Sequence, residues 1–108
     1  MKELSANEIT KMAISYLNAT GHNVWRQNNI HTPGRKFIGM KGLPDIIGYC
    51  KRSGISVFCE VKKNGDKLSE DQISFLTLAE GNGCQVYIAH ELNGQAELTK
   101  WSQYNDKG

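Results

Sequence analysis

The sequence predicts an α/β protein in which one central mixed sheet is flanked by helices. Two helix-start signals lie far apart in the chain, short apolar runs typical of strands fall between them, and another such run follows the second helix. A length of 108 residues suits a single domain over residues 1–108 with a buried core. A composition of 39% hydrophobic and 22% charged residues excludes a disordered tail, and no apolar run is long enough for a membrane span, so a soluble protein is expected.

The first helix is expected over residues 5–20. Ser5 and Glu8 are spaced as a capping box, in which each side chain accepts a hydrogen bond from the other residue's backbone amide. Apolar residues recur at helical spacing behind this box, and Gly21 is suited to end the helix.

Three strands are expected next, because runs of apolar residues are separated by residues that favour turns. These strands cover residues 23–27, 44–50 and 55–63, with a turn at 51–54. Residues 28–43 form the longest irregular stretch, apart from a short strand-like piece at 36–38. Loops of this length are often functional.

A second helix is predicted to start at Ser69, because Gln72 completes a second capping box, and to end at Gly81. Residues 84–89 are expected to form a buried strand.

The Asn93-Gly94 pair predicts a hairpin that returns as an edge strand over residues 95–98. Residues 99–101 are expected to begin a short final helix. Of the two tryptophans, Trp25 is expected in the core and Trp101 against the C-terminal segment, in preference to a base-stacking role for either.

The net charge of +2 is unevenly distributed along the chain. Residues 26–67 contain nine basic and three acidic residues, whereas residues 68–108 contain two basic and six acidic residues. A basic middle segment favours a face that binds a polyanion such as nucleic acid. Charge alone leaves open a solvated surface without a partner.

The strands on either side of the 51–54 turn bring three charged residues together. Asp45 lies opposite Glu60 if residues 52–53 form the turn, and opposite Lys62 if residues 53–54 form it. Both registers place the three side chains on one face of the sheet. Two neighbouring carboxylates favour a cation between them, and Mg²⁺ prefers such oxygen ligands. With Lys62 acting on a water molecule, this set suits metal-assisted phosphodiester hydrolysis, although the spacing also permits a simple cross-strand salt bridge.

These residues resemble the signature of the PD-(D/E)XK nuclease superfamily, with Pro44-Asp45 followed by Glu60-Val61-Lys62. A longer ordered set resembles the VRR-NUC (virus-type replication-repair nuclease) branch: residues 42–48, 60–62 and 67–72 with Phe75, preceded by 25–28 and 34–38. The resemblance covers roughly residues 5–90. It implies a restriction-endonuclease-like core of helix, three strands, helix and strand (αβββαβ).

The resemblance also implies a catalytic metal ion, Mg²⁺, for which Mn²⁺ substitutes. Its ligands would be Asp45, Glu60 and the backbone carbonyl of Val61, and Lys62 would position or activate the attacking water. Glu8 falls where the superfamily often has an acidic residue that completes the metal site, and Gln72 falls at the motif glutamine beside the active site. Both residues also have a purely local interpretation as capping-box partners.

Four basic residues are candidate phosphate contacts: Arg26, Arg35, Lys36 and Lys41. Phosphate contacts position nucleic acid without reading its sequence. Lys41 is the best of the four, because it precedes Asp45 by four residues with the flexible Gly42 between them.

The sequence therefore predicts a Mg²⁺-dependent DNA endonuclease. One chain has one active site, so cutting two strands predicts a homodimer. Resemblance to stand-alone viral members implies structure-selective cleavage of branched DNA, such as Holliday junctions, during replication, recombination or repair, in the cytoplasm of a host if the protein is viral. The alternative is a non-catalytic nucleic-acid-binding module on the same fold.

Overall fold

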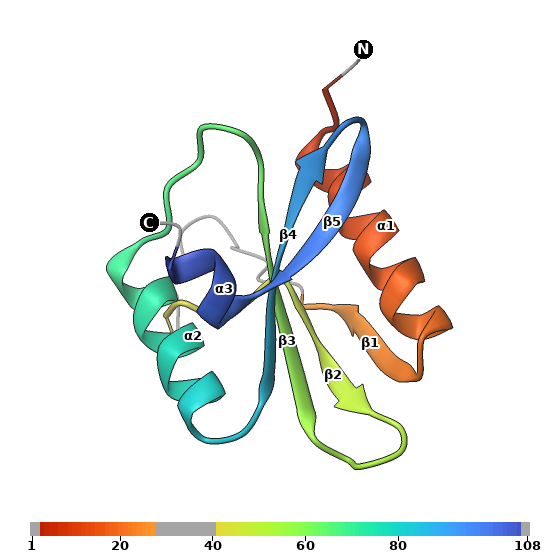
Figure 1. Ribbon diagram of the computed structural model, residues 1–108, viewed down its shortest axis with the longest axis vertical. Helices are drawn as coiled ribbons and strands as arrows, with labels where there is room; N and C mark the ends of the chain where they lie inside the picture. The colour runs from red at the N-terminus through yellow and green to blue at the C-terminus, as the bar shows by residue number, and fades with distance from the viewer. Residues whose placement is uncertain (1–2, 28–40, 107–108) are drawn as a thin grey trace, which may run out of the picture.

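The computed structural model describes residues 3–27 and 41–106. The elements of this part of the chain, in order, are α1 (Ala6–Ala19), β1 (His22–Arg26), β2 (Ile46–Cys50), β3 (Ser56–Lys62), α2 (Glu70–Gly81), β4 (Gln85–Leu92), β5 (Gln95–Lys100) and α3 (Trp101–Asp106). The strands form one five-stranded sheet in the order β1-β2-β3-β4-β5. The predicted mixed sheet flanked by helices is confirmed (Figure 1).

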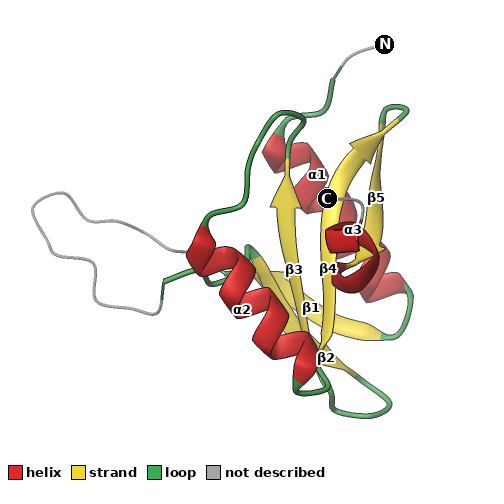
Figure 2. Ribbon diagram, turned by 60° about the vertical axis from the view of Figure 1, so that its left-hand side comes forward, coloured by secondary structure: helices red, strands yellow, loops and turns green. Residues whose placement is uncertain are grey.

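The sheet is mixed because β3 and β4 run parallel, while the other neighbouring strands run antiparallel. A parallel pair needs a crossover connection, and α2 supplies it. Helix α1 covers one face of the sheet, and helices α2 and α3 cover the other (Figures 1 and 2).

The sheet separates the core into two clusters. Strand β3 contributes to both, because its side chains alternate between the two faces of the sheet. Val57 and Cys59 are fully buried in the cluster beneath α1. Phe58 packs into the cluster beneath α2 and α3. The same alternation places Glu60 and Lys62 on the α2 face.

Both predicted capping boxes are present. The backbone amide of Glu8 donates to Ser5 Oγ at 3.1 Å, and the backbone amide of Gln72 donates to Ser69 Oγ at 3.1 Å. In each box the third helical side chain also accepts from the serine amide. The two helix starts are therefore fixed by neighbouring residues alone, as the sequence predicts.

The C-terminal boundaries differ from the prediction. Strand β4 continues beyond residue 89 to Leu92, and β5 continues to Lys100 instead of ending at residue 98. Thr99 pairs with Ile88, and Lys100 pairs with Tyr87. This pairing keeps both residues in the strand, so the final helix begins at Trp101.

The two tryptophans have opposite environments. Trp101 is 3% exposed, and its indole nitrogen donates to Thr77 Oγ1 at 3.2 Å, as expected for a residue that packs the C-terminal segment. The prediction that Trp25 is a core residue is wrong, because its side chain is 46% exposed. Val24 is the buried residue of β1, so alternation turns Trp25 to the α2 face, where the buried cluster draws its sheet residues from β3 and β4.

The strand-like piece predicted at residues 36–38 lies outside the described residues, as does most of the predicted loop. Within the described residues, no helix is both long enough and apolar enough to cross a membrane.

Candidate active site

The register between β2 and β3 places Asp45 across from Glu60. Ile46 pairs with Cys59, so the preceding residue of β2 falls opposite the following residue of β3. The connection between the strands is wider than the predicted two-residue turn, because the Cys50 amide donates to the Ile55 carbonyl and residues 51–54 form the loop. The register is nevertheless the first of the two that the sequence allows.

Asp45 is tied to the strands on both of its sides. Its Oδ2 accepts a hydrogen bond of 2.9 Å from the backbone amide of Val61. Its backbone carbonyl accepts a hydrogen bond of 2.7 Å from the amide of Gln27, just after β1. These bonds fix the carboxylate at the end of β2, beside β3.

Glu60 is the most unusual residue of the site. Its side chain is 2% exposed, and its Oε2 is buried without a hydrogen-bond partner among the described residues. Burial, followed by the neighbouring Asp45 carboxylate, raises the pKa of Glu60 to about 9, and Lys62 only partly opposes this shift. A buried, unpartnered carboxylate oxygen beside a second carboxylate fits a divalent cation, which would neutralise both groups.

Lys62 is held by two oxygen acceptors. Its Nζ donates to the Lys67 carbonyl at 3.2 Å and to Gln72 Oε1 at 3.4 Å. The same Oε1 accepts from the Ser69 amide at 2.8 Å. Gln72 is therefore a capping-box residue and a neighbour of Lys62 at once, so the two interpretations of this residue are compatible.

Gly42 allows the chain before Asp45 to pass directly against α2. It has a φ of +82°, and a Cβ atom at this position would lie 2.4 Å from the carbonyl oxygen of Asp71 in the first turn of α2. Only glycine avoids both the contact and the left-handed strain. Lys41 is exposed immediately before this glycine. The sequence indicated flexibility at Gly42 but not this close approach.

Glu8 lies on α1, the helix on the opposite face of the sheet from Glu60. Its Oε1 accepts a hydrogen bond of 3.0 Å from the Ser5 amide, which engages the side chain in its own helix cap. The described residues contain no group of three or more His, Cys, Asp and Glu side chains that could hold a metal. The structure thus brings Asp45, Glu60, Lys62 and Gln72 together without Glu8, whose role as a metal ligand stays a prediction.

Among the predicted phosphate contacts, Arg26 lies close to Asp45. The two residues line the same hollow of about 260 Å³, together with Ala6, Asn7, Thr10 and Gln27. The guanidinium of Arg26 donates to Asn7 Oδ1 at 2.7 Å. Arg35 and Lys36 lie outside the described residues.

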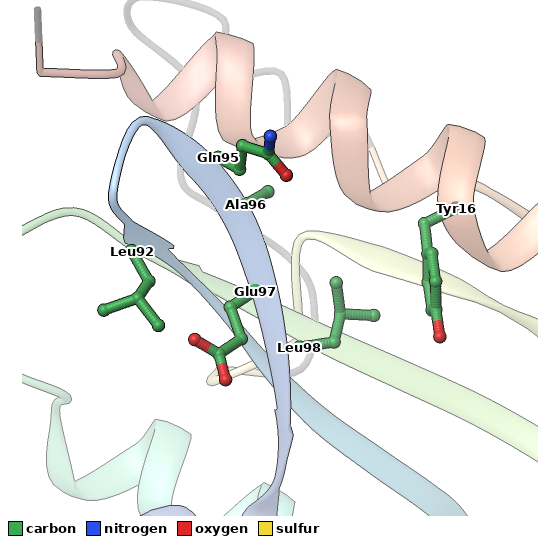
Figure 3. A pocket seen from close by; sticks show the side chains of 6 residues that line it. All are labelled: Tyr16, Leu92, Gln95, Ala96, Glu97 and Leu98. Carbon is green, nitrogen blue, oxygen red and sulfur yellow. The ribbon is translucent and has the colours of Figure 1, made fainter.

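A larger hollow of about 350 Å³ lies elsewhere, between Tyr16 of α1 and the β4–β5 hairpin (Figure 3). It is lined by Tyr16, Leu92 and residues 95–98. None of the predicted site residues lines it, so the charged cluster and not this hollow marks the candidate site.

The chain matches the VRR-NUC domain family over residues 24–91, a range that includes Asp45, Glu60, Lys62 and Gln72. This protein belongs to the VRR-NUC domain family. The resemblance inferred from the sequence motifs is thereby confirmed, and the chain is a nuclease-family protein.

Two solved structures share the fold of this VRR-NUC chain. One is Hjc of Archaeoglobus fulgidus, a Holliday junction resolvase, with a TM-score of 0.58 and 22% identity over 88% of this chain and 71% of that chain. The other is a VRR-NUC domain with a TM-score of 0.53 and 24% identity over 77% of this chain and 81% of that one. No curated protein sequence matches. The expected restriction-endonuclease-like fold is confirmed.

Proposed function

We propose that this VRR-NUC protein is a Mg²⁺-dependent DNA endonuclease, in which Mn²⁺ substitutes for Mg²⁺. The observation that carries the proposal is the buried, unpartnered Oε2 of Glu60 beside Asp45. Burying two neighbouring acidic side chains destabilises the fold unless a cation binds between them, so without a cation, substitution of either acid would stabilise the protein. Retention of both acids, with a lysine alongside, favours catalysis over a simple binding role.

The residues that would hold the metal are Asp45, Glu60 and the backbone carbonyl of Val61, and all three supply the oxygen ligands that Mg²⁺ prefers. When bound, the metal ion would neutralise charge on the scissile phosphate and lower the pKa of a water molecule. The hydrogen bond from the Val61 amide keeps one oxygen of Asp45 in a fixed place for this role.

Lys62 would position the attacking water. An ammonium group has three donors, and the Lys67 carbonyl and Gln72 Oε1 take two of them in this structure. The remaining donor would bind the water or a phosphate oxygen. Gln72 acts as a positioning residue, because it fixes the direction of the ammonium through a side chain that its own helix cap holds in place.

DNA would lie across the basic part of the chain. Lys41 and Arg26 are the proposed phosphate contacts within the described residues, and Arg35 and Lys36 are proposed outside them. We also propose that the protein forms a homodimer with two sites and cleaves branched DNA such as Holliday junctions during replication, recombination or repair, in the cytoplasm. The shared fold with a Holliday junction resolvase supports this substrate class.

Nicking of supercoiled plasmid and cleavage of a four-way junction, each with Mg²⁺, Mn²⁺ or chelator, test the proposal. We expect metal-dependent cutting by the wild type and loss of cutting by Asp45→Ala with DNA binding retained. Leu78→Ala is the control, because this side chain is 67% exposed on α2 and is assigned no function. DNA binding without cutting under either metal would contradict the proposal and favour a non-catalytic binding module.

A further inference from the structure

Two aromatic side chains are exposed together on the face of the sheet that carries the candidate active site. Trp25 of β1 is 46% exposed and Tyr49 of β2 is 41% exposed. Their ring centroids are 6.5 Å apart with an interplanar angle of 72°. Aromatic rings contribute most to stability when they are buried, so two exposed neighbours call for an explanation. We refer to these two residues as the aromatic pair.

By strand register, the aromatic pair lies on the same face as Asp45, and Trp25 is the member nearer to it. Trp25 pairs with Ile47, which follows Asp45 by two residues along β2. Side chains two residues apart on a strand share a face, and strand geometry places the Cα atoms of Trp25 and Asp45 about 8 Å apart.

The aromatic pair is also held in a defined arrangement. The amide nitrogen of Asn23 donates to the Tyr49 hydroxyl at 2.9 Å. The edge-to-face contact between the rings leaves ring surface of each residue open to solvent. A partner with a flat π-face can therefore stack on the exposed ring surface.

The charge around the aromatic pair favours a polyanion. The described residues 20–27 and 41–58, which include β1 and β2, contain four basic residues: Lys41, Lys51, Arg52 and Arg26, the last of which bonds Asn7 on the α1 side of the sheet. Asp45 is the single acidic residue in these two segments. A ligand that is both polyanionic and rich in flat aromatic rings is a nucleic acid.

We propose that the aromatic pair stacks an unpaired nucleobase of the DNA that the active site cleaves. This inference rests on the proposed nuclease function and specifies its substrate. Bases inside a duplex are already stacked on both faces, so the pair discriminates in favour of unpaired nucleotides. The substrate is therefore branched DNA in which a base near the scissile phosphate is unpaired or becomes unpaired at the branch point.

Tryptophan fluorescence in the presence of a metal chelator tests the inference, because binding is then measured without cleavage. Trp101 is 3% exposed, so quenching by an oligonucleotide reports on Trp25. A short oligothymidylate should quench the wild-type protein. The affinities of the variants are measured by the fluorescence anisotropy of a dye-labelled oligothymidylate, because Trp25→Ala removes the quenched residue, and this variant should bind about 5- to 150-fold more weakly. Binding to a fully paired duplex should change by no more than about two-fold. Trp25→Phe, which keeps a ring, should recover part of the affinity, and Leu78→Ala should bind as the wild type does.

Three outcomes separate the possibilities. If a folded Trp25→Ala variant binds oligothymidylate as tightly as the wild type, the stacking inference is overturned, whether or not the protein cuts DNA. If Trp25→Ala changes the mass in solution and leaves oligothymidylate binding unchanged, the pair is a protein interface and the inference is again overturned. If the pair binds unpaired bases but the wild type never cuts with Mg²⁺ or Mn²⁺, the stacking site stands and the proposed nuclease activity fails.

Discussion

The starts of α1 and α2 have the same local chemistry and different surroundings. In each, a serine caps the helix and the third helical residue returns a hydrogen bond to the serine amide. The glutamate of the first box, Glu8, lies on the helix that covers the face opposite Glu60. The glutamine of the second box, Gln72, also accepts a hydrogen bond from Lys62. A helix cap becomes part of an active site only when the fold brings that helix start beside the reactive groups.

The largest effect is expected for Lys62, which donates a hydrogen bond to Gln72 of the second capping box. Lys62→Ala should lower the rate of plasmid nicking by about 100- to 1000-fold, as removal of a charged group from a phosphodiester-cleaving site does. DNA affinity measured in chelator should change little, because Lys62 is half-buried and is proposed to position the attacking water. A variant that cuts at the wild-type rate would remove Lys62 from the mechanism.

The next largest effect on the cleavage rate is expected from Gln72→Ala, with Glu8→Ala as the comparison. Gln72→Ala should lower cleavage by about 10- to 100-fold, because it frees the ammonium that the side chain orients. Glu8→Ala removes an equivalent cap, so a loss of cleavage beyond about two-fold would support the predicted role of Glu8 in the metal site.

Adding Gln72→Ala to Lys62→Ala should cause no further loss, because Gln72 acts through Lys62. Equal losses from Glu8→Ala and Gln72→Ala would show that both caps matter only for helix stability, or that Glu8 belongs to the metal site after all.

Glu60, on the α2 face of the sheet, makes the free energy of unfolding depend on pH. Because the pKa of Glu60 rises from 4.5 to about 9 in the folded protein, folding takes up a proton between these values. The free energy of unfolding of the metal-free protein should therefore fall as pH rises through this window, by at most about 1.4 kcal/mol per pH unit.

Thermal melts in chelator at several pH values measure this effect. Glu60→Gln should flatten the slope and raise the melting temperature at pH 8, while losing cleavage. Parallel pH profiles for the wild type and Glu60→Gln would contradict the account of Glu60 as a buried and unpaired acid.

The smallest effect comes from the caps themselves. Ser5→Ala and Ser69→Ala should each lower the free energy of unfolding by about 1 kcal/mol. Denaturant unfolding measures both, and Ser15→Ala in the exposed middle of α1 is the control. Both variants keep the backbone amide that donates to the Glu8 or the Gln72 side chain, so each should leave cleavage within about two-fold. A loss of cleavage in Ser69→Ala as large as in Gln72→Ala would show that helix stability, and not the contact with Lys62, accounts for the effect of Gln72.

The sequence predicted what depends on near neighbours. Both capping boxes, the Asn93-Gly94 turn and the shared face of Asp45, Glu60 and Lys62 follow from residue spacing, because helix and strand periods fix which side chains share a face. The family resemblance added the identity of the site, and the family match agrees with it.

Only the tertiary structure decided how deeply each side chain is buried and what it meets across the fold. Val24 lies in the core beneath α1, whereas Trp25 lies on the α2 face and is exposed. Both residues are apolar, so the sequence could not tell which of the two is buried. Likewise, the isolation of Glu60 Oε2 and the contact between Gln72 and Lys62 depend on how α2 packs against β3. Burial and long-range contact are properties of packed surfaces, and residues distant in sequence create those surfaces together.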